Sequence, residues 1–318
     1  MLVLRILVAL LLLVALIAAA TLWRVNARRT AAAASHPPEG QFVEVDGHPV
    51  HYVQRGTGPD VVLIHGASGN TRDMTFSLLD RLAERYRVTA FDRPGLGYTP
   101  RLAASGVTVA QQADLLAGAA ATLGIDRPVV VGQSFGGAVA MAWAVNHADR
   151  AAAVVSISGA TYPWPGTLDR LYAAVALPVI GPVLAHLIAA WTPMSYVEAQ
   201  VDGVFTPQSA PEGYADYIGL GLIMRPASFR ANAQQRTDLR EELRALTPAY
   251  RDLPMPVEAI HGTADDIVGL EIHSEALAND APEGHLTRLE GIGHMPHHVA
   301  QDAVVAAIDR AAQRAGLR

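Results

Sequence analysis

Five short apolar runs constrain the fold of this 318-residue chain more than any other feature of its sequence. Each run has six or seven residues, and the runs lie at 60–66, 87–92, 128–133, 153–158 and 256–262. Continuous apolar runs of this length are typical of strands that are covered on both faces, as in a parallel sheet. Stretches with a helical period lie between or after them, at 74–85, 108–123, 135–147, 270–279 and 302–315. This alternation predicts an α/β fold with a mostly parallel sheet flanked by helices.

Two segments depart from this alternation. Residues 42–46 and 49–55 alternate apolar and polar side chains, which predicts a hairpin with one exposed face. Residues 160–251 are rich in proline, tryptophan and tyrosine and are too many for a plain connection between two strands. We expect them to form a helical cap over the carboxyl edge of the sheet, so that residues 42–159 and 252–318 are the two parts of the core.

The first 29 residues form a separate, strongly apolar segment. Residues 6–23 contain no charge and no proline, and they nearly reach the roughly 20 residues that a helix needs to span a bilayer. We therefore expect residues 1–29 to form one N-terminal transmembrane anchor and residues 30–41 to be an irregular linker. A cleaved signal segment, with Arg5 as its charged start, is the alternative.

The charges that flank this segment indicate its orientation. Arg24, Arg28 and Arg29 follow it, whereas only Arg5 precedes it. By the positive-inside rule this difference favours a cell-membrane protein with its catalytic part on the cytoplasmic side. Cleavage would instead yield a secreted or periplasmic protein.

Composition excludes several classes of function. The net charge is −6, and no basic stripe of the kind that binds nucleic acid is present. The chain has no cysteine, which excludes disulfides, thiolate metal sites and a cysteine nucleophile.

The run at 128–133 leads directly into Gly132-Gln133-Ser134-Phe135-Gly136. This G-x-S-x-G pattern, placed between a strand and a helix, is typical of a nucleophilic serine on a strained turn. We expect Gly132 and Gly136 to allow close backbone approach on either side of Ser134. A serine hydroxyl also needs a base and a group that orients the base.

Both partners follow Ser134 in the order that such a site requires. Asp265 lies in the HGTADD segment after the run at 256–262, and His294 lies in GIGHMPHH after an expected strand at 285–290. With this order of nucleophile, acid and histidine the chain resembles the α/β-hydrolases from residue 42 to 315. The resemblance favours Asp265 over the adjacent Asp266 as the orienting acid.

Further motifs of the α/β-hydrolases are present. His65-Gly66-Ala67-Ser68 resembles the HG loop of the family, and Asp92 to Tyr98, DRPGLGY, resembles its DRPGxGxS turn. The resemblance implies that the backbone N–H groups of Ala67 and Phe135 form the oxyanion hole, with His65 and Gly66 as supporting loop residues. We expect Asp92 and Arg93 to be structural.

The resemblance implies a serine hydrolase that cleaves an ester of an apolar substrate, without a cofactor. We expect no metal, although His297 and His298 follow His294 closely, because no helical H-E-x-x-H is present. Carbon–carbon bond hydrolysis and cofactor-free perhydrolysis use the same three residues and stay open, as does a membrane-tethered module without catalysis. In this fold an aspartate at position 134 would instead imply epoxide hydrolysis or dehalogenation.

The expected partners are a small or lipid-like ester and the membrane, while the sequence does not indicate an oligomeric state. The apolar run 168–191 is interrupted by Pro178, Gly181 and Pro182, which makes a second membrane span a poor interpretation. It can form the core of the cap, or an apolar lid that lines an acyl pocket or touches lipid.

Overall fold

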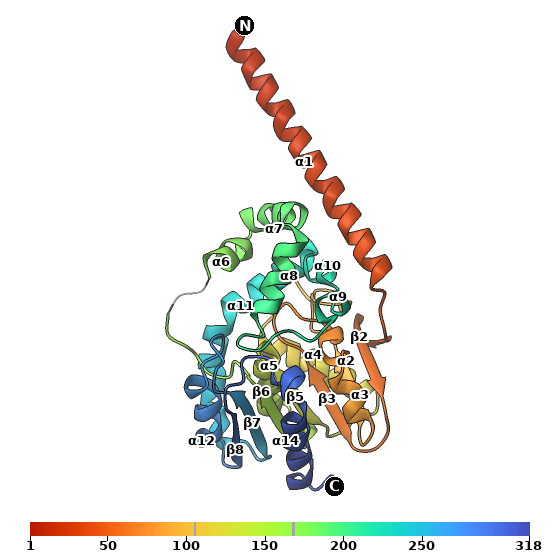
Figure 1. The fold of residues 1–318 in the computed structure, drawn as a ribbon, viewed down its shortest axis with the longest axis vertical. Coiled ribbons are helices and arrows are strands. Elements are labelled where there is room, and N and C mark those ends of the chain that lie inside the picture. The colour runs from red at the N-terminus through yellow and green to blue at the C-terminus, as the bar shows by residue number, and fades with distance from the viewer. Residues whose placement is uncertain (105, 167–168) are drawn as a thin grey trace.

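The computed structural model of the chain describes residues 1–104, 106–166 and 169–318. An eight-stranded sheet in the order β1-β2-β4-β3-β5-β6-β7-β8 forms its centre, with helices on both faces (Figure 1). Strand β2 pairs antiparallel with β1 and β4, and the other neighbouring strands are parallel. The strands are β1 Gln41–Val45, β2 His48–Arg55, β3 Asp60–Ile64, β4 Arg87–Phe91, β5 Val129–Gln133, β6 Ala153–Ile157, β7 Val257–Gly262 and β8 Gly284–Leu289. The α/β prediction is confirmed.

The five apolar runs form five adjacent strands, from β4 to β7 in the order of the sheet. Every residue of β5, β6 and β7 is buried, because helices cover both faces of these strands. The alternating segments form the hairpin β1–β2, as predicted, at one edge of the sheet.

Two apolar layers hold the sheet between helices. One layer includes α4 (Val109–Thr122) and α5 (Phe135–Asn146), and the other includes α3 (Leu78–Ala83) and α14 (Gln301–Arg314). Thr108 caps α4 in a capping box with Gln111. Helix α14 has Ala300 at its N-cap, and Asp302 lies in its first turn. The remaining helices of the core are α2 (Thr71–Thr75), a π-helix (Glu271–Glu275), α12 (Ala276–Asp280) and α13 (Pro296–Val299), with a 3₁₀ turn at Ala148–Arg150.

The insertion between β6 and β7 is helical and lies above the sheet in Figure 1. Its helices are α6 (Arg170–Ala176), α7 (Ile180–Trp191), α8 (Met194–Gly203), α9 (Tyr214–Tyr217), α10 (Leu220–Ile223) and α11 (Pro226–Leu246), followed by a 3₁₀ helix at Thr247–Asp252. Residue 168, the start of the apolar run, lies outside the described residues. The run is broken into α6 and α7, and only part of it is buried.

Helix α1 (Leu2–Ser35) is one uninterrupted helix of 34 residues that projects from the body (Figure 1). The expectation of an irregular linker over 30–41 is therefore wrong for residues 30–35. These residues include four alanines, which have the highest helix propensity, and the chain leaves the helix only at His36. By length and composition α1 can cross a membrane or act as a signal sequence, and its most apolar stretch is not buried at all.

The foot of α1 packs on helix α7 of the cap. The guanidinium of Arg28 donates to the carbonyls of Ala189 (2.7 Å) and Thr192 (2.9 Å). Trp191 Nε1 donates to Thr21 Oγ1 at 3.0 Å. The helix is thus fixed to the body rather than tethered to it.

Candidate active site

Ser134 lies on the turn between β5 and α5 with φ 51° and ψ −118°, a strained conformation for a residue other than glycine. Close backbone approach permits this turn. A Cβ at Gly132 would lie 2.1 Å from the carbonyl oxygen of Gly136, and a Cβ at Gly136 would lie 2.2 Å from that of Ile64. Only glycine fits at either position, which is the arrangement expected from the sequence.

Asp265 and His294 are joined by a hydrogen bond. His294 Nδ1 donates to Asp265 Oδ2 at 2.7 Å, and both side chains are almost completely buried. Since the proton is on Nδ1, the lone pair of the neutral ring is on Nε2. His294 is therefore in the tautomer that can accept a proton from a hydroxyl group.

A second histidine, His261 on β7, also contacts Asp265. Its Nε2 faces Asp265 Oδ2 (3.0 Å) and the carbonyl of Val268 (2.8 Å), which are both acceptors, so Nε2 carries the proton. Its Nδ1 then accepts from Ser274 Oγ at 2.7 Å. Burial opposes ionisation, but the bonds from His261 and His294 hold the pKa of Asp265 below its ordinary value.

Asp266 has a different environment. It is exposed, in contrast to the buried carboxylate of Asp265 beside it. Among the described residues it makes no hydrogen bond to His294, so the geometry favours Asp265 as the acid.

The serine turn and the histidine loop are in contact through the residue before Ser134. Gln133 Nε2 donates to the carbonyl of His294 at 3.3 Å. Within the part of the chain that the structure describes, no hydrogen bond joins Ser134 Oγ to His294. Catalytic hydrogen bonds of this kind are often long before substrate binds. The structure therefore brings the acid and the histidine into contact, and Gln133 joins the histidine loop to the turn that carries Ser134.

The HG loop lies against the serine turn. A Cβ at Gly66 would lie 3.2 Å from Ser134 Cβ and 2.2 Å from Gln133 Oε1. The N–H groups of Ala67 and Phe135 donate to no acceptor among residues 1–104, 106–166 and 169–318. Their role as oxyanion donors stays a prediction.

Arg93 supports this loop from within the core. The fully buried guanidinium donates from Nε to the His65 carbonyl (3.0 Å) and from Nη2 to the Gly66 carbonyl (2.8 Å). It also lies over the ring of Phe135, 4.3 Å from the centroid. Burial lowers the pKa of Arg93 to about 9, which leaves it charged at neutral pH. Arg93 thus positions the backbone on both sides of the expected oxyanion hole.

His65 itself is fully buried and has both ring nitrogens paired. Nδ1 donates to the Gly66 carbonyl at 2.9 Å, and Nε2 accepts from the Arg93 N–H at 3.1 Å. Asp92 accepts from the N–H of Tyr98 and from His51 Nδ1, both at 2.7 Å. These hydrogen bonds join His65 and Asp92 to the neighbouring loops.

The cap contacts two of the loops of the site. Asn232 of α11 makes a pair of bonds with Ser68, accepting from its N–H (2.8 Å) and donating to its hydroxyl (2.9 Å). Gln208 accepts from the N–H of Gly293, beside His294, at 2.9 Å. The sequence did not predict either contact, because the residues that flank Asn232 and Gln208 do not indicate a hydrogen-bond partner about 80 to 160 residues away.

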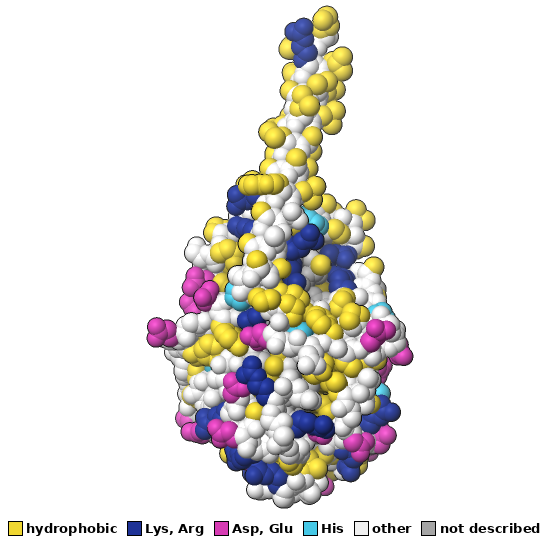
Figure 2. Space-filling view, turned by 90° about the vertical axis from the view of Figure 1, so that its right-hand side faces the viewer, with side chains coloured by type: hydrophobic (Ala, Val, Ile, Leu, Met, Phe, Trp, Pro, Cys, Tyr) yellow, Lys and Arg dark blue, Asp and Glu magenta, His cyan; other side chains and the backbone are white. Residues whose placement is uncertain are grey.

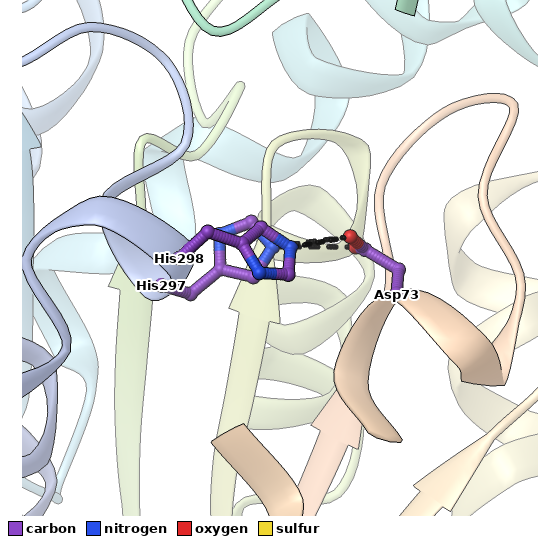
Figure 3. A group of neighbouring side chains, drawn as sticks. All are labelled: Asp73, His297 and His298. Carbon is purple, nitrogen blue, oxygen red and sulfur yellow. Dashed lines mark hydrogen bonds and ion pairs between the residues drawn. The ribbon is translucent and has the colours of Figure 1, made fainter. Parts of the chain in front are cut away.

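His297 and His298 do not face Asp265 but Asp73 of α2, as Figure 3 shows. Their Nε2 atoms lie 3.3 Å and 2.9 Å from Asp73 Oδ1, which also accepts from the hydroxyl of Tyr214 in the cap at 2.7 Å. Burial opposes ionisation of Asp73, but the two histidines hold its pKa well below the ordinary value.

The cluster of Asp73, His297 and His298 offers one oxygen and two imidazole nitrogens, donor types that zinc accepts. Ligating histidines almost always donate from the other ring nitrogen to an acceptor. Here the Nδ1 atoms of both histidines are buried without a partner in the described part of the chain. The cluster therefore fits a hydrogen-bonded bridge between α2, the histidine loop and the cap better than it fits a metal site.

Comparisons with known proteins agree with the fold. A family model described as alpha/beta hydrolase fold matches residues 59–301, which include Ser134, Asp265 and His294. Haloalkane dehalogenase 2 of Mycobacterium tuberculosis is 27% identical over 290 residues, and the alignment covers 86% of this chain and 94% of that protein.

Two further likenesses differ in extent. The dihydrolipoyllysine-residue acetyltransferase component of the acetoin cleaving system of Cupriavidus necator is 43% identical over 120 residues, and the chain spans only 31% of its length. The crystal structure of a membrane phospholipase A has a TM-score of 0.66 at 21% identity, and the match covers 96% of this chain and 98% of that one. The shared architecture thus extends into α1.

Proposed function

The chain belongs to the α/β-hydrolase family, and we propose that it is a serine hydrolase that cleaves carboxylic esters with an apolar acyl or alcohol part. The observation that carries this proposal is the buried bond of 2.7 Å between His294 Nδ1 and Asp265 Oδ2, in a loop that Gln133 joins to the strained turn of Ser134. That bond leaves His294 Nε2 free to act as a base toward Ser134.

The reaction follows the usual course for these three groups. Ser134 Oγ attacks the ester carbonyl carbon while His294 Nε2 takes its proton, and the charged carbonyl oxygen accepts from the N–H groups of Ala67 and Phe135. The leaving alcohol takes the proton from His294 as the carbon–oxygen bond breaks. Water, deprotonated by His294, then attacks the acyl-enzyme, and the bond to Ser134 Oγ breaks as His294 returns the proton to this oxygen and the acid is released. Asp265 keeps its negative charge and stabilises the imidazolium in both steps.

The residue at position 134 separates this chemistry from that of the dehalogenase relative. In this fold, dehalogenation and epoxide hydrolysis need an aspartate nucleophile, whereas this chain has serine at the turn. A serine with a histidine base is suited to acyl transfer.

Substitution of Ser134 tests the proposal. We expect Ser134→Ala to abolish hydrolysis of p-nitrophenyl butyrate, and we expect a fluorophosphonate probe to label the parent protein but not the variant. Hydrolysis by the variant at the parent rate would exclude the serine mechanism. Absence of labelling in the parent would favour a tethered binding module. A parent that is labelled but cleaves no ester of any acyl length would favour a carbon–carbon substrate.

We also propose that α1 anchors the enzyme in the cell membrane through residues 6–23, with the body on the cytoplasmic side. The full chain should then float with phosphatidylcholine vesicles and resist extraction by carbonate. Because the chain has no cysteine, a single one at the exposed His48 (His48→Cys) reports the side of the body. Labelling of intact cells by a membrane-impermeant maleimide would contradict a cytoplasmic location.

A further inference from the structure

A basic cavity lies where the foot of α1 meets the cap. Its volume is about 630 Å³, and α1, α7, α11 and the loop after β4 contribute to its wall. The basic side chains that line it are Arg29, Arg101, Arg225, Arg230 and His186. Among the described residues no aspartate or glutamate lines it. None of the three proposed catalytic residues does so either, so the cavity is separate from the active site.

The arginines around this cavity lie near enough to one another to affect each other's pKa values. Burial and the neighbouring Arg230 lower the pKa of Arg101. Burial also lowers the pKa of Arg225, with Tyr98 and Asp92 opposing this change and Arg29 adding to it. Arg230 Nη1 donates to the Ala104 carbonyl at 3.2 Å, but its Nε is buried without a hydrogen-bond partner in the described part of the chain. Clustered cations with a buried unpaired donor are stabilised by an anion, and arginine is suited to phosphate.

The position of the cavity indicates where such an anion would come from. Arg29 follows the end of the apolar segment at Trp23 by six residues, a rise of about 9 Å along the helix. This distance is comparable to the thickness of one headgroup layer, roughly 5–8 Å. Figure 2 shows Lys and Arg side chains gathered around the foot of the projecting helix.

The cap beside the cavity exposes large apolar side chains, and in Figure 1 its helix α7 lies at the end of the body from which α1 projects. The exposed residues near α7 are Leu171, Leu177, Val179, Ile180, Val183, Leu187 and Trp191. Val179 is 81% exposed and Val183 60% exposed, although both are large and apolar. An exposed apolar face next to an apolar anchor and an arginine cluster matches the layers of an anionic membrane surface.

We propose that the cavity lined by Arg29, Arg225 and Arg230 binds the phosphate of an anionic lipid headgroup, while the apolar face of α7 lies in the bilayer surface. The proposal rests on the membrane anchoring proposed above. A bound headgroup would join α1, the cap and the loop after β4, and would hold the body against the membrane.

The test uses the full chain in micelles of a neutral detergent, followed by thermal unfolding. Dihexanoyl phosphatidate is expected to raise the melting temperature in a saturable way. Arg230→Gln is expected to need at least tenfold more of this lipid for the same rise, and Arg230→Lys to restore part of the affinity. Arg244→Gln, on the same helix but outside the cavity and with the same change of charge, should behave like the parent.

Three results would overturn the proposal. One is a rise that is equal in the parent and in Arg230→Gln. Another is the absence of any rise in the parent. The third is an equal rise with inorganic phosphate or glycerol 3-phosphate at the same concentration, which would identify a site for free phosphate. Hydrolysis of a soluble ester by Arg230→Gln at the parent rate shows that the variant is folded. The vesicle flotation described above tests the anchor separately, so failure of one proposal is distinguishable from failure of the other.

Discussion

Replacement of Asp265 by asparagine tests the proposed mechanism at its orienting group. The two carboxylate oxygens have different partners. Oδ1 accepts from the N–H groups of Ile267 (2.9 Å) and Val268 (3.0 Å), while Oδ2 accepts from His261 (3.0 Å) and His294 (2.7 Å). An amide has only one oxygen, and the two backbone donors cannot be removed, so the oxygen is expected to take the Oδ1 position.

The NH₂ group of Asp265→Asn then takes the Oδ2 position and faces two rings. It meets the N–H of His261, so two donors oppose each other at about 3.0 Å. It also donates to Nδ1 of His294, which shifts the proton of that ring to Nε2. In this tautomer His294 cannot accept the proton of Ser134.

The expected cost follows from this change of tautomer. The same substitution in the aspartate of a serine protease lowers kcat about 10⁴-fold, and we expect a similar loss here. On the barrier this equals about 5.4 kcal/mol. The opposed donors should also lower the free energy of unfolding by about 1–3 kcal/mol.

The assay is steady-state hydrolysis of p-nitrophenyl butyrate at pH 7, together with the rate of fluorophosphonate labelling. Asp266→Asn is the matched control, since Asp266 is the adjacent acid and is exposed, and it should keep the parent rate. If Asp265→Asn stays within tenfold of the parent while it is folded, Asp265 does not orient His294.

Three further predictions concern the cap and the buried titratable groups. Asn232→Ala removes both bonds to Ser68, which is expected to misplace the neighbouring oxyanion donor and so to reduce stabilisation of the transition state. The rate constant kcat should fall by about one to two orders of magnitude with little change in KM. An effect on KM alone would contradict this. Burial raises the pKa of Glu242 to about 7, so ionisation of this carboxyl lowers the free energy of unfolding as the pH rises from 4.5 to above 7. Glu242→Gln should therefore melt at the same temperature as the parent at pH 4.5 and at a higher temperature at pH 8, where its free energy of unfolding should be greater by about 1 kcal/mol after allowance for solvent screening. Burial lowers the pKa of His297 to about 4, below the value of 6.5 in the unfolded chain, so the unfolded chain binds the proton first as the pH decreases. The free energy of unfolding should therefore fall as the pH decreases from 6.5 to 4, and this group contributes at most about 3 kcal/mol to the fall. Melting curves of the parent and of His297→Gln across this pH range check this, because the melting temperature of the variant should depend less steeply on pH.

The parts of the fold that could be predicted depend on local patterns. Runs such as 128–133 are continuous and apolar because helices cover both faces, and that pattern needs no knowledge of distant residues. Likewise Ser134 is recognisable because its neighbours at 132 and 136 must be glycine for steric reasons. Helix ends are less predictable, because the residues on either side of an end often have similar local preferences. Helix α14 begins at Gln301 and not at 302, and α1 continues to Ser35 and not to 29.

The parts that could not be predicted are contacts between distant segments. His261, Asp73 and Asn232 each lie in surroundings that give no sign of a partner, and each contacts a loop of the site only after the sheet and cap have formed. The histidines at 297 and 298 show the same limit. Their spacing from His294 indicates proximity, but the direction of their rings toward Asp73 is set by the path of the loop into α13.

The continuity of α1 has a mechanical consequence. A helix of 34 residues is about 51 Å long, and it is fastened to the cap from Thr21 onward, so in the proposed anchoring the membrane segment and the body share one rigid axis. Helices that are too long for a bilayer respond by tilting. In a thinner membrane the whole enzyme would therefore lean as a lever, and the distance between the lipid surface and Ser134 would change with the thickness of the bilayer.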